Sequence, residues 1–169
     1  MESPEESGIC GEHLEWYYKD EVLVIVGTGK MDGYAYSVRN APWYDDLQNQ
    51  IGCVIIGEGV TSIGNRAFSG CINLTKIEIP DSVTSIGNAA FSDCSSLTEI
   101  EMPDSVTSIG ESAFAGCRSL TEFTMPDGVT SIEDEVFWCC SSLKEITIPD
   151  SVTCIGSEAF EWCGSLKEI

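Results

Sequence analysis

Glutamates recur at two positions of the chain with a spacing that would gather their carboxylates on one surface. Both series advance with the same 23-residue period. The first is Lys76, Glu99, Glu122, Glu145 and Glu168, and the second is Glu78, Glu101, Thr124 and Thr147. If residues one period apart stack, six carboxylates share one face, where like charges repel each other. Such a face could bind a basic protein segment or Ca²⁺, whose ligands are carboxylate and carbonyl oxygens.

The acidic face also has a simpler interpretation, a solvated surface that keeps the chain soluble and prevents association through strand edges. Calcium is the weaker binding hypothesis because the sequence contains no Asp-x-Asp-x-Asp-Gly loop. Two of these glutamates could in principle cleave glycosides. That reaction needs two carboxyl groups in different environments, whereas a repeated series gives each member the same environment.

Residues for other catalytic chemistry are scarce. His13 is the sole histidine of the sequence, and neither serine nor cysteine forms a nucleophile motif with it. A zinc site needs cysteine or histidine pairs at short spacing, and no Cys-x-x-Cys occurs. We therefore expect no enzymatic activity, no cofactor and no metal site.

The nine cysteines divide into two groups. Five of them keep the period of the glutamates, at Cys71, Cys94, Cys117, Cys140 and Cys163. Stacking would bring these five close enough for bridging, but their number is odd and their neighbours are apolar, so we expect a column of small buried thiols. The other four, Cys10, Cys53, Cys139 and Cys154, are the candidates for reactivity or pairing, and the sequence leaves their redox state open.

The charge balance limits the partners. Eight basic residues stand against 28 acidic ones, for a net charge of −20, which repels nucleic acids and anionic membrane surfaces. We expect neutral, cationic or glycan partners and no nucleic acid. No apolar run reaches the ~20 residues of a transmembrane segment, and the polar start has no features of a signal peptide. The chain is therefore either cytoplasmic or the product of removing a leader.

The elements that would position these residues repeat with the same period. Five phenylalanines mark it, at Phe68, Phe91, Phe114, Phe137 and Phe160. A fixed period of this length indicates a solenoid. Each repeat contains a strand such as residues 77–79 that stops at a proline, and a second extended piece such as residues 83–86. The spacing of Phe91 and Cys94 then predicts a short α or 3₁₀ turn.

The chain divides into three parts. Residues 1–7 are predicted to form a flexible acidic tail. Residues 8–51 do not share the period, and their apolar runs at 14–18 and 22–26 predict a β-hairpin, so we interpret this part as an N-terminal β cap. Residues 52–169 form a solenoid of about five 23-residue repeats, of which the last is incomplete.

The unit Ile-Pro-Asp-Ser-Val-Thr-Ser-Ile-Gly-x-x-Ala-Phe-x-x-Cys-x-x-Leu resembles the BspA-like leucine-rich repeat. The segments at 7–11, 27–31 and 41–44 also resemble the module that precedes these repeats in bacterial members. The resemblance implies a right-handed solenoid with a parallel sheet on one face, a role in adhesion or recognition, and a secreted or cell-surface location. It carries over no catalytic residue. We expect a protein- or glycan-recognition module, with a structural spacer or self-assembly unit as the alternative.

Repeat four and the C-terminus depart from the pattern. Glu133 replaces a turn glycine, and because a left-handed backbone disfavours glutamate, the sequence predicts a different local backbone there. Trp138 fills a position that is small in the first three repeats, and with Trp162 it predicts a contact patch. The chain stops inside a strand, which would leave an open end at Phe160, Leu166 and Ile169. Either the chain is a fragment of a longer array, or two copies form a homodimer through these ends.

Overall fold

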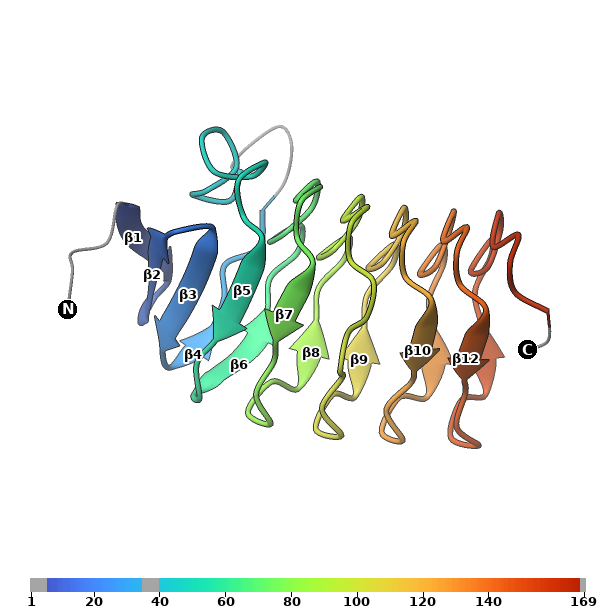
Figure 1. Cartoon of the computed structure of the whole chain (residues 1–169). Coiled ribbons are helices and arrows are strands. Elements are labelled where there is room, and N and C mark those ends of the chain that lie inside the picture. Colours follow the sequence, from blue (N-terminus) through green and yellow to red (C-terminus); the bar gives the residue numbers. More distant parts are fainter. Residues whose placement is uncertain (1–5, 35–39, 168–169) are drawn as a thin grey trace.

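The computed structural model describes residues 6–34 and 40–167, which form an elongated stack of coils with strands on two long faces (Figure 1). The cap begins with β1 (Glu6–Gly11), β2 (Leu14–Lys19) and β3 (Val22–Gly27), which pair antiparallel in chain order. The predicted hairpin is therefore confirmed as β2 and β3. β1 begins at Glu6, so residues 6 and 7 belong to this sheet and the predicted tail extends too far along the chain.

The cap continues directly into the first long face of the solenoid. β3 pairs parallel with β5 (Cys53–Ile56), which pairs in turn with β7 (Lys76–Glu78). Further along the same face, β10 (Glu122–Thr124) pairs parallel with β12 (Glu145–Thr147). Partners in the ladders between successive coils are one period apart, as Glu122 and Glu145 are. Glu122 and Glu145 therefore stack as the sequence predicts, whereas residues 99–101 form no ladder with β7 or β10.

A second parallel ladder covers the other long face. Its four-stranded part runs in the order β4 (Gly29–Lys30), β6 (Val60–Ile63), β8 (Ser85–Ile86) and β9 (Ser108–Ile109). A two-stranded part follows, formed by β11 (Ser131–Ile132) and β13 (Cys154–Ile155). The chain thus has parallel sheet on two faces, one from each extended piece of the repeat, and not on one face only.

A single row of stacked rings forms the centre of the core. The five periodic phenylalanines lie with ring centroids 5.4 to 5.7 Å apart and nearly parallel planes. Trp43 of the cap extends the row, stacking on Phe68 at 5.6 Å while its indole N–H donates to the carbonyl of Ala67. The cap therefore covers the first coil with an aromatic ring of its own, which removes an exposed apolar end.

The third edge of each coil, which we call the turn edge, is made of consecutive turns around the periodic phenylalanine. The described residues contain no helix, so the predicted helical turn is wrong. Two residues per coil have positive φ at this edge, and left-handed residues interrupt a helical backbone. They are Arg66 and Gly70, Ala89 and Asp93, Ser112 and Gly116, Glu135 and Cys139, and Glu158 and Trp162. The amides between them bond sideways to the next coil, as Phe91 N does to Ala113 O at 2.8 Å.

The cysteine column is buried, as predicted, and all nine cysteines are free thiols. From Cys94 onward each thiol donates to the carbonyl of a phenylalanine in the preceding coil, as Cys117 Sγ does to Phe91 O at 3.2 Å. Burial raises the pKa of the Cys71 and Cys117 thiols to about 12. These thiols are therefore structural, since the thiolate is the reactive form.

The turn glycines have a different purpose from the one the sequence suggested. Gly87, Gly110 and their equivalents do not have positive φ, but a Cβ on Gly110 would lie 2.7 Å from the amide nitrogen of Asn88 in the preceding coil. Glycine is needed here for close approach. Glu133 occupies this position in repeat four, so the argument from a left-handed backbone is wrong and the consequence is steric.

The ladder is interrupted at Glu133. Gly87, Gly110 and Gly156 each donate their amide to an isoleucine carbonyl of the preceding coil, whereas the described residues show no such bond from Glu133 to Ile109. The bond from Thr130 to Thr107 is likewise missing in this part of the chain, although its equivalents are present in the neighbouring coils. β9 and β11 consequently do not pair.

Candidate functional site

The first long face carries the predicted acidic surface. The carboxylates of Glu78, Glu99, Glu101, Glu122 and Glu145 are all exposed there. β7, β10 and β12 position members of the two series on each side of the segment 99–101, which forms no strand. Glu168, the sixth predicted member, lies outside the described residues. The strands alternate exposed and covered side chains, which is why each glutamate points away from the core.

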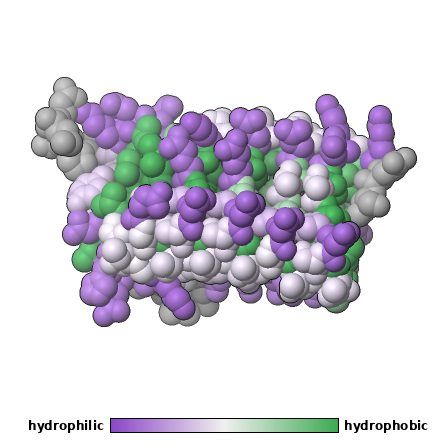
Figure 2. All heavy atoms as spheres, turned by 90° about the horizontal axis from the view of Figure 1, so that it is seen from below, coloured by the Kyte–Doolittle hydropathy of each residue, from purple (hydrophilic) through white to green (hydrophobic). Residues whose placement is uncertain are grey.

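A third series of carboxylates borders this face, and the sequence reasoning above missed it. Its members follow the strands of the first face, in the tight turns that lead to the second face, and are exposed; they are Glu58, Asp81, Asp104, Asp127 and Asp150. Seen from the side of these tight turns, hydrophilic side chains form rows along the length of the solenoid (Figure 2). The signal that finds them in the sequence is the same 23-residue period. We call the ten carboxylates together the acidic face.

The acidic face is almost without neutralising partners. Lys76 Nζ binds Glu78 Oε1 at 2.7 Å, and this hydrogen bond raises the pKa of the lysine. Within the described residues no other carboxylate of the face has an ion pair. Because exposed pairs are weak, the face keeps a high density of negative charge that is available to a cationic partner.

Two shallow grooves run along the segment at residues 99–101. This segment forms no strand and pairs neither with β7 nor with β10 in the described structure. The groove on the β7 side encloses about 400 Å³ and the one on the β10 side about 510 Å³, and Glu99 and Glu101 line both. Glu78 and Glu101 stand one coil apart at the opening on the β7 side, where their carboxylates repel each other.

The two tryptophans of the predicted contact patch lie in adjoining coils. Trp138 is half-buried, and its indole N–H donates to Glu161 Oε2 at 3.3 Å. Trp162 is 67% exposed. A hydrogen bond with Glu161 raises the pKa of Glu158, and repulsion between the two carboxyl groups raises it further, so the surroundings of Trp138 are acidic and not apolar. A contact role for the pair stays a prediction.

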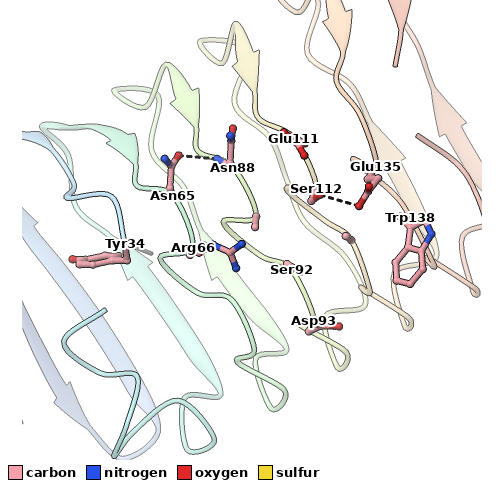
Figure 3. A pocket seen from close by; sticks show the side chains of 12 residues that line it. Tyr34, Asn65, Arg66, Asn88, Ser92, Asp93, Glu111, Ser112, Glu135 and Trp138 are labelled. Carbon is pink, nitrogen blue, oxygen red and sulfur yellow. Dashed lines mark hydrogen bonds between the residues drawn. The ribbon is translucent and has the colours of Figure 1, made fainter. Parts of the chain in front are cut away.

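Trp138 also closes one end of a groove on the turn edge. The groove encloses about 470 Å³ and crosses several coils (Figure 3). Its floor is formed by small residues, Ala89, Ser92, Ser112 and Ala115. Polar side chains, among them Arg66, Asn88 and Asp93, surround this floor.

The last coil is more exposed than those before it. Ile155 is 52% exposed, whereas its equivalents Ile109 and Ile132 are 3% and 2% exposed. Phe160 stacks on Phe137 but is only partly buried, and so is Leu166. Ile169, the third residue of the predicted open end, lies outside the described residues.

The part of the chain that the structure describes contains neither a membrane-spanning helix nor a metal site. No helix there has the length and apolar composition that crossing a membrane requires. No group of three or more histidine, cysteine, aspartate or glutamate residues there has the arrangement of a metal site.

Residues 47–169 match the family model of the BspA type leucine-rich repeat region, with six copies of the repeat. The chain belongs to this family. Leucine-rich repeat proteins are generally not enzymes, and the BspA-type repeat forms a protein-interaction module. No curated protein sequence matches the chain.

Solved structures of bacterial leucine-rich repeat proteins are similar to this BspA-type chain. One from Eubacterium ventriosum is 30% identical with a TM-score of 0.80, over 97% of this chain and 43% of its own. One from Bacteroides ovatus is 30% identical with a TM-score of 0.70, over 94% and 46%. A leucine-rich cell surface protein from Faecalibacterium prausnitzii is 28% identical with a TM-score of 0.65, over 98% and 54%. The chain therefore spans about half the length of these proteins.

Proposed function

We propose that this BspA-type chain is a recognition module of a secreted or cell-surface protein, and that its acidic face binds a basic segment of a partner protein. The acidic face carries the proposal. It presents ten exposed carboxylates in three parallel rows, and a single lysine pairs with one of them in the described structure. The surface location is supported by the similar cell surface protein from Faecalibacterium prausnitzii.

The physical basis is electrostatic complementarity along a rigid scaffold. A basic segment laid along the rows would meet a carboxylate at each coil, about 5 Å apart. Complementary charge accelerates association and selects against acidic competitors. The grooves beside residues 99–101 give lysine or arginine side chains a place to lie between rows.

The test compares two charge reversals that change the net charge equally. The first variant carries Glu99→Lys, Glu122→Lys and Glu145→Lys on the acidic face. The matched control carries Glu12→Lys, Asp45→Lys and Asp46→Lys on exposed residues of the cap. The probe is a decalysine peptide, titrated by calorimetry at about 0.05 M and 0.15 M salt.

We expect the acidic-face variant to bind decalysine at least tenfold more weakly than the wild type, and the cap variant to lose far less of its affinity for decalysine. Equal losses would refute a localised site, because they would show that only the net charge matters. A screen of extracellular-matrix proteins and mucins then searches for the partner. A chain that binds none of them would favour the structural spacer.

A further inference from the structure

The turn-edge groove differs from the acidic face because its residues break the repeat. One series along it reads Arg66, Ala89, Ser112, Glu135 and Glu158, and the next reads Ser69, Ser92, Ala115, Trp138 and Glu161. Every member of these series lies at the same place in its own coil. Stacking alone therefore does not dictate these residues, since the backbone has the same course with a large or a small side chain.

The variation creates a recess with closed ends. The small side chains of the second and third coils form the floor, while Tyr34 and Arg66 stand at one end and Glu135 and Trp138 at the other. The span from Arg66 to Glu135 is three coil steps, or about 15 Å at ~5 Å a step. This length and a volume of about 470 Å³ suit a short linear ligand.

The side chains that line the groove include both hydrogen-bond donors and hydrogen-bond acceptors. Asn65 Oδ1 accepts from the amide of Asn88 at 2.8 Å, and Ser112 Oγ donates to Glu135 Oε2 at 3.3 Å. In the described structure the side chains of Asn88 and Ser92 have no hydrogen-bond partner, so amide and hydroxyl groups that both donate and accept face the groove. Sugar hydroxyls, which also donate and accept, match such a lining.

Trp138 supplies the aromatic surface. The hydrogen bond from its indole N–H to Glu161 fixes the orientation of the ring at the end of the groove. A tryptophan with its polar edge bonded and its face open combines an apolar platform with a fixed position. The C–H face of a pyranose ring packs on such a platform while its hydroxyls remain available to the polar lining.

A peptide fits this groove less well. The backbone amides along it already bond to the next coil, as Ala89 N does to Glu111 O and Ser112 N to Asp134 O. The groove thus offers no unpaired strand edge to which a peptide could add. Its floor of alanine and serine also has no deep apolar pocket for an anchoring side chain.

We propose that the turn-edge groove binds a linear neutral oligosaccharide of three or four units, with one ring stacked on Trp138. Three carboxylates and a single guanidinium line the groove, so sulfated or sialylated chains are repelled. This proposal does not depend on the acidic face, which lies on another side of the coil.

The test uses tetrasaccharides of glucose, mannose, galactose or N-acetylglucosamine, titrated while tryptophan fluorescence is recorded. Trp138→Ala places in coil four the residue that coil three has at Ala115, and Ser92→Trp places in coil two the residue that coil four has, so both variants suit the fold. Trp162→Ala is the matched control, because Trp162 is exposed and lies outside the groove. Thermal melting checks that each variant is folded.

We expect at least one tetrasaccharide to bind with a Kd of about 1 mM or lower. Trp138→Ala should weaken this binding at least tenfold, Ser92→Trp should abolish it by filling the floor, and Trp162→Ala should change it less than twofold. The proposal fails if none of the sugars binds, if Trp138→Ala or Ser92→Trp binds like the wild type, or if decalysine displaces the bound sugar.

Discussion

Replacing Glu133 by glycine should strengthen the joint between the third and fourth coils. At Gly87, Gly110 and Gly156, glycine lets two coils approach until the Cβ of any other residue would lie 2.5 to 2.7 Å from a backbone nitrogen. The Cβ of Glu133 prevents that approach, and the amides of Glu133 and Thr130 make no bond to the preceding coil in the described structure. Removing the side chain removes the obstacle.

The size of the effect follows from the hydrogen bonds that the variant gains and the backbone entropy that it loses on folding. Two backbone hydrogen bonds at ~1 kcal/mol each add about 2 kcal/mol. Glycine costs about 0.5 to 1 kcal/mol of backbone entropy. The Ser131 hydroxyl also loses its bond to Glu133, but this pair is exposed and contributes little. We expect a net gain of about 1 kcal/mol in the free energy of unfolding, or a rise in Tm of about 2–4 °C.

The assay is urea denaturation combined with hydrogen exchange of the amides at positions 130 and 133. Glu133→Ala is the control, because it removes the same carboxylate from a chain of net charge −20 but keeps the Cβ. Glycine should slow exchange at both amides, whereas alanine should leave it fast. Equal stabilisation by the two variants would refute the steric argument and assign the effect to charge.

Two further predictions concern the core. Phe114 is fully buried and stacks on Phe91 and Phe137, so Phe114→Ala should lower the free energy of unfolding by about 3–5 kcal/mol and reduce hydrogen-exchange protection in both neighbouring coils. Phe160 has a single stacked neighbour, so Phe160→Ala should lower the free energy of unfolding clearly less. Equal losses from the two variants would contradict the coupling between coils. Burial raises the pKa of Cys71 and Cys117 from 9.0 to about 12. Between these pH values the folded chain keeps thiol protons that the unfolded chain releases. The contribution of these two thiols to the free energy of unfolding is therefore fully present below pH 9 and is lost as the pH rises toward 12. Urea midpoints at pH 8 and pH 10.5 measure this loss, which should shrink in the Cys71→Ala, Cys117→Ala double variant.

The stacking of the repeats was accessible from the sequence because the period is strict. Phe68 and Phe91 stack as their spacing requires, and Glu122 meets Glu145 in register. The position of Trp43 in the row of rings could not be predicted from the period. The period places Asp45 one step before Phe68, although it is Trp43 that stacks on Phe68. A cap that ends a periodic array need not keep the period.

The turn edge could not be predicted in the same way. The spacing of Phe91 and Cys94 suits a helical turn as well as consecutive β-turns, and only hydrogen bonds to the next coil decide between them. The need for Gly110 likewise depends on the backbone of Asn88 in the preceding coil. The sequence signal for the groove is a difference between repeats, such as Ala115 against Trp138, and not a feature that the repeats share.

Both sheets are open at the same joint, and this determines how the rod carries mechanical load. The first face is open on both sides of residues 99–101, and the second face is open between β9 and β11. Residues 99–101 and β9 belong to the third coil and β10 and β11 to the fourth, so neither sheet joins these two coils. The turn edge is bonded across this joint, as Phe114 N is to Val136 O. Tension along the axis is therefore carried there mainly by the turn edge, and the third and fourth coils should be the first to separate.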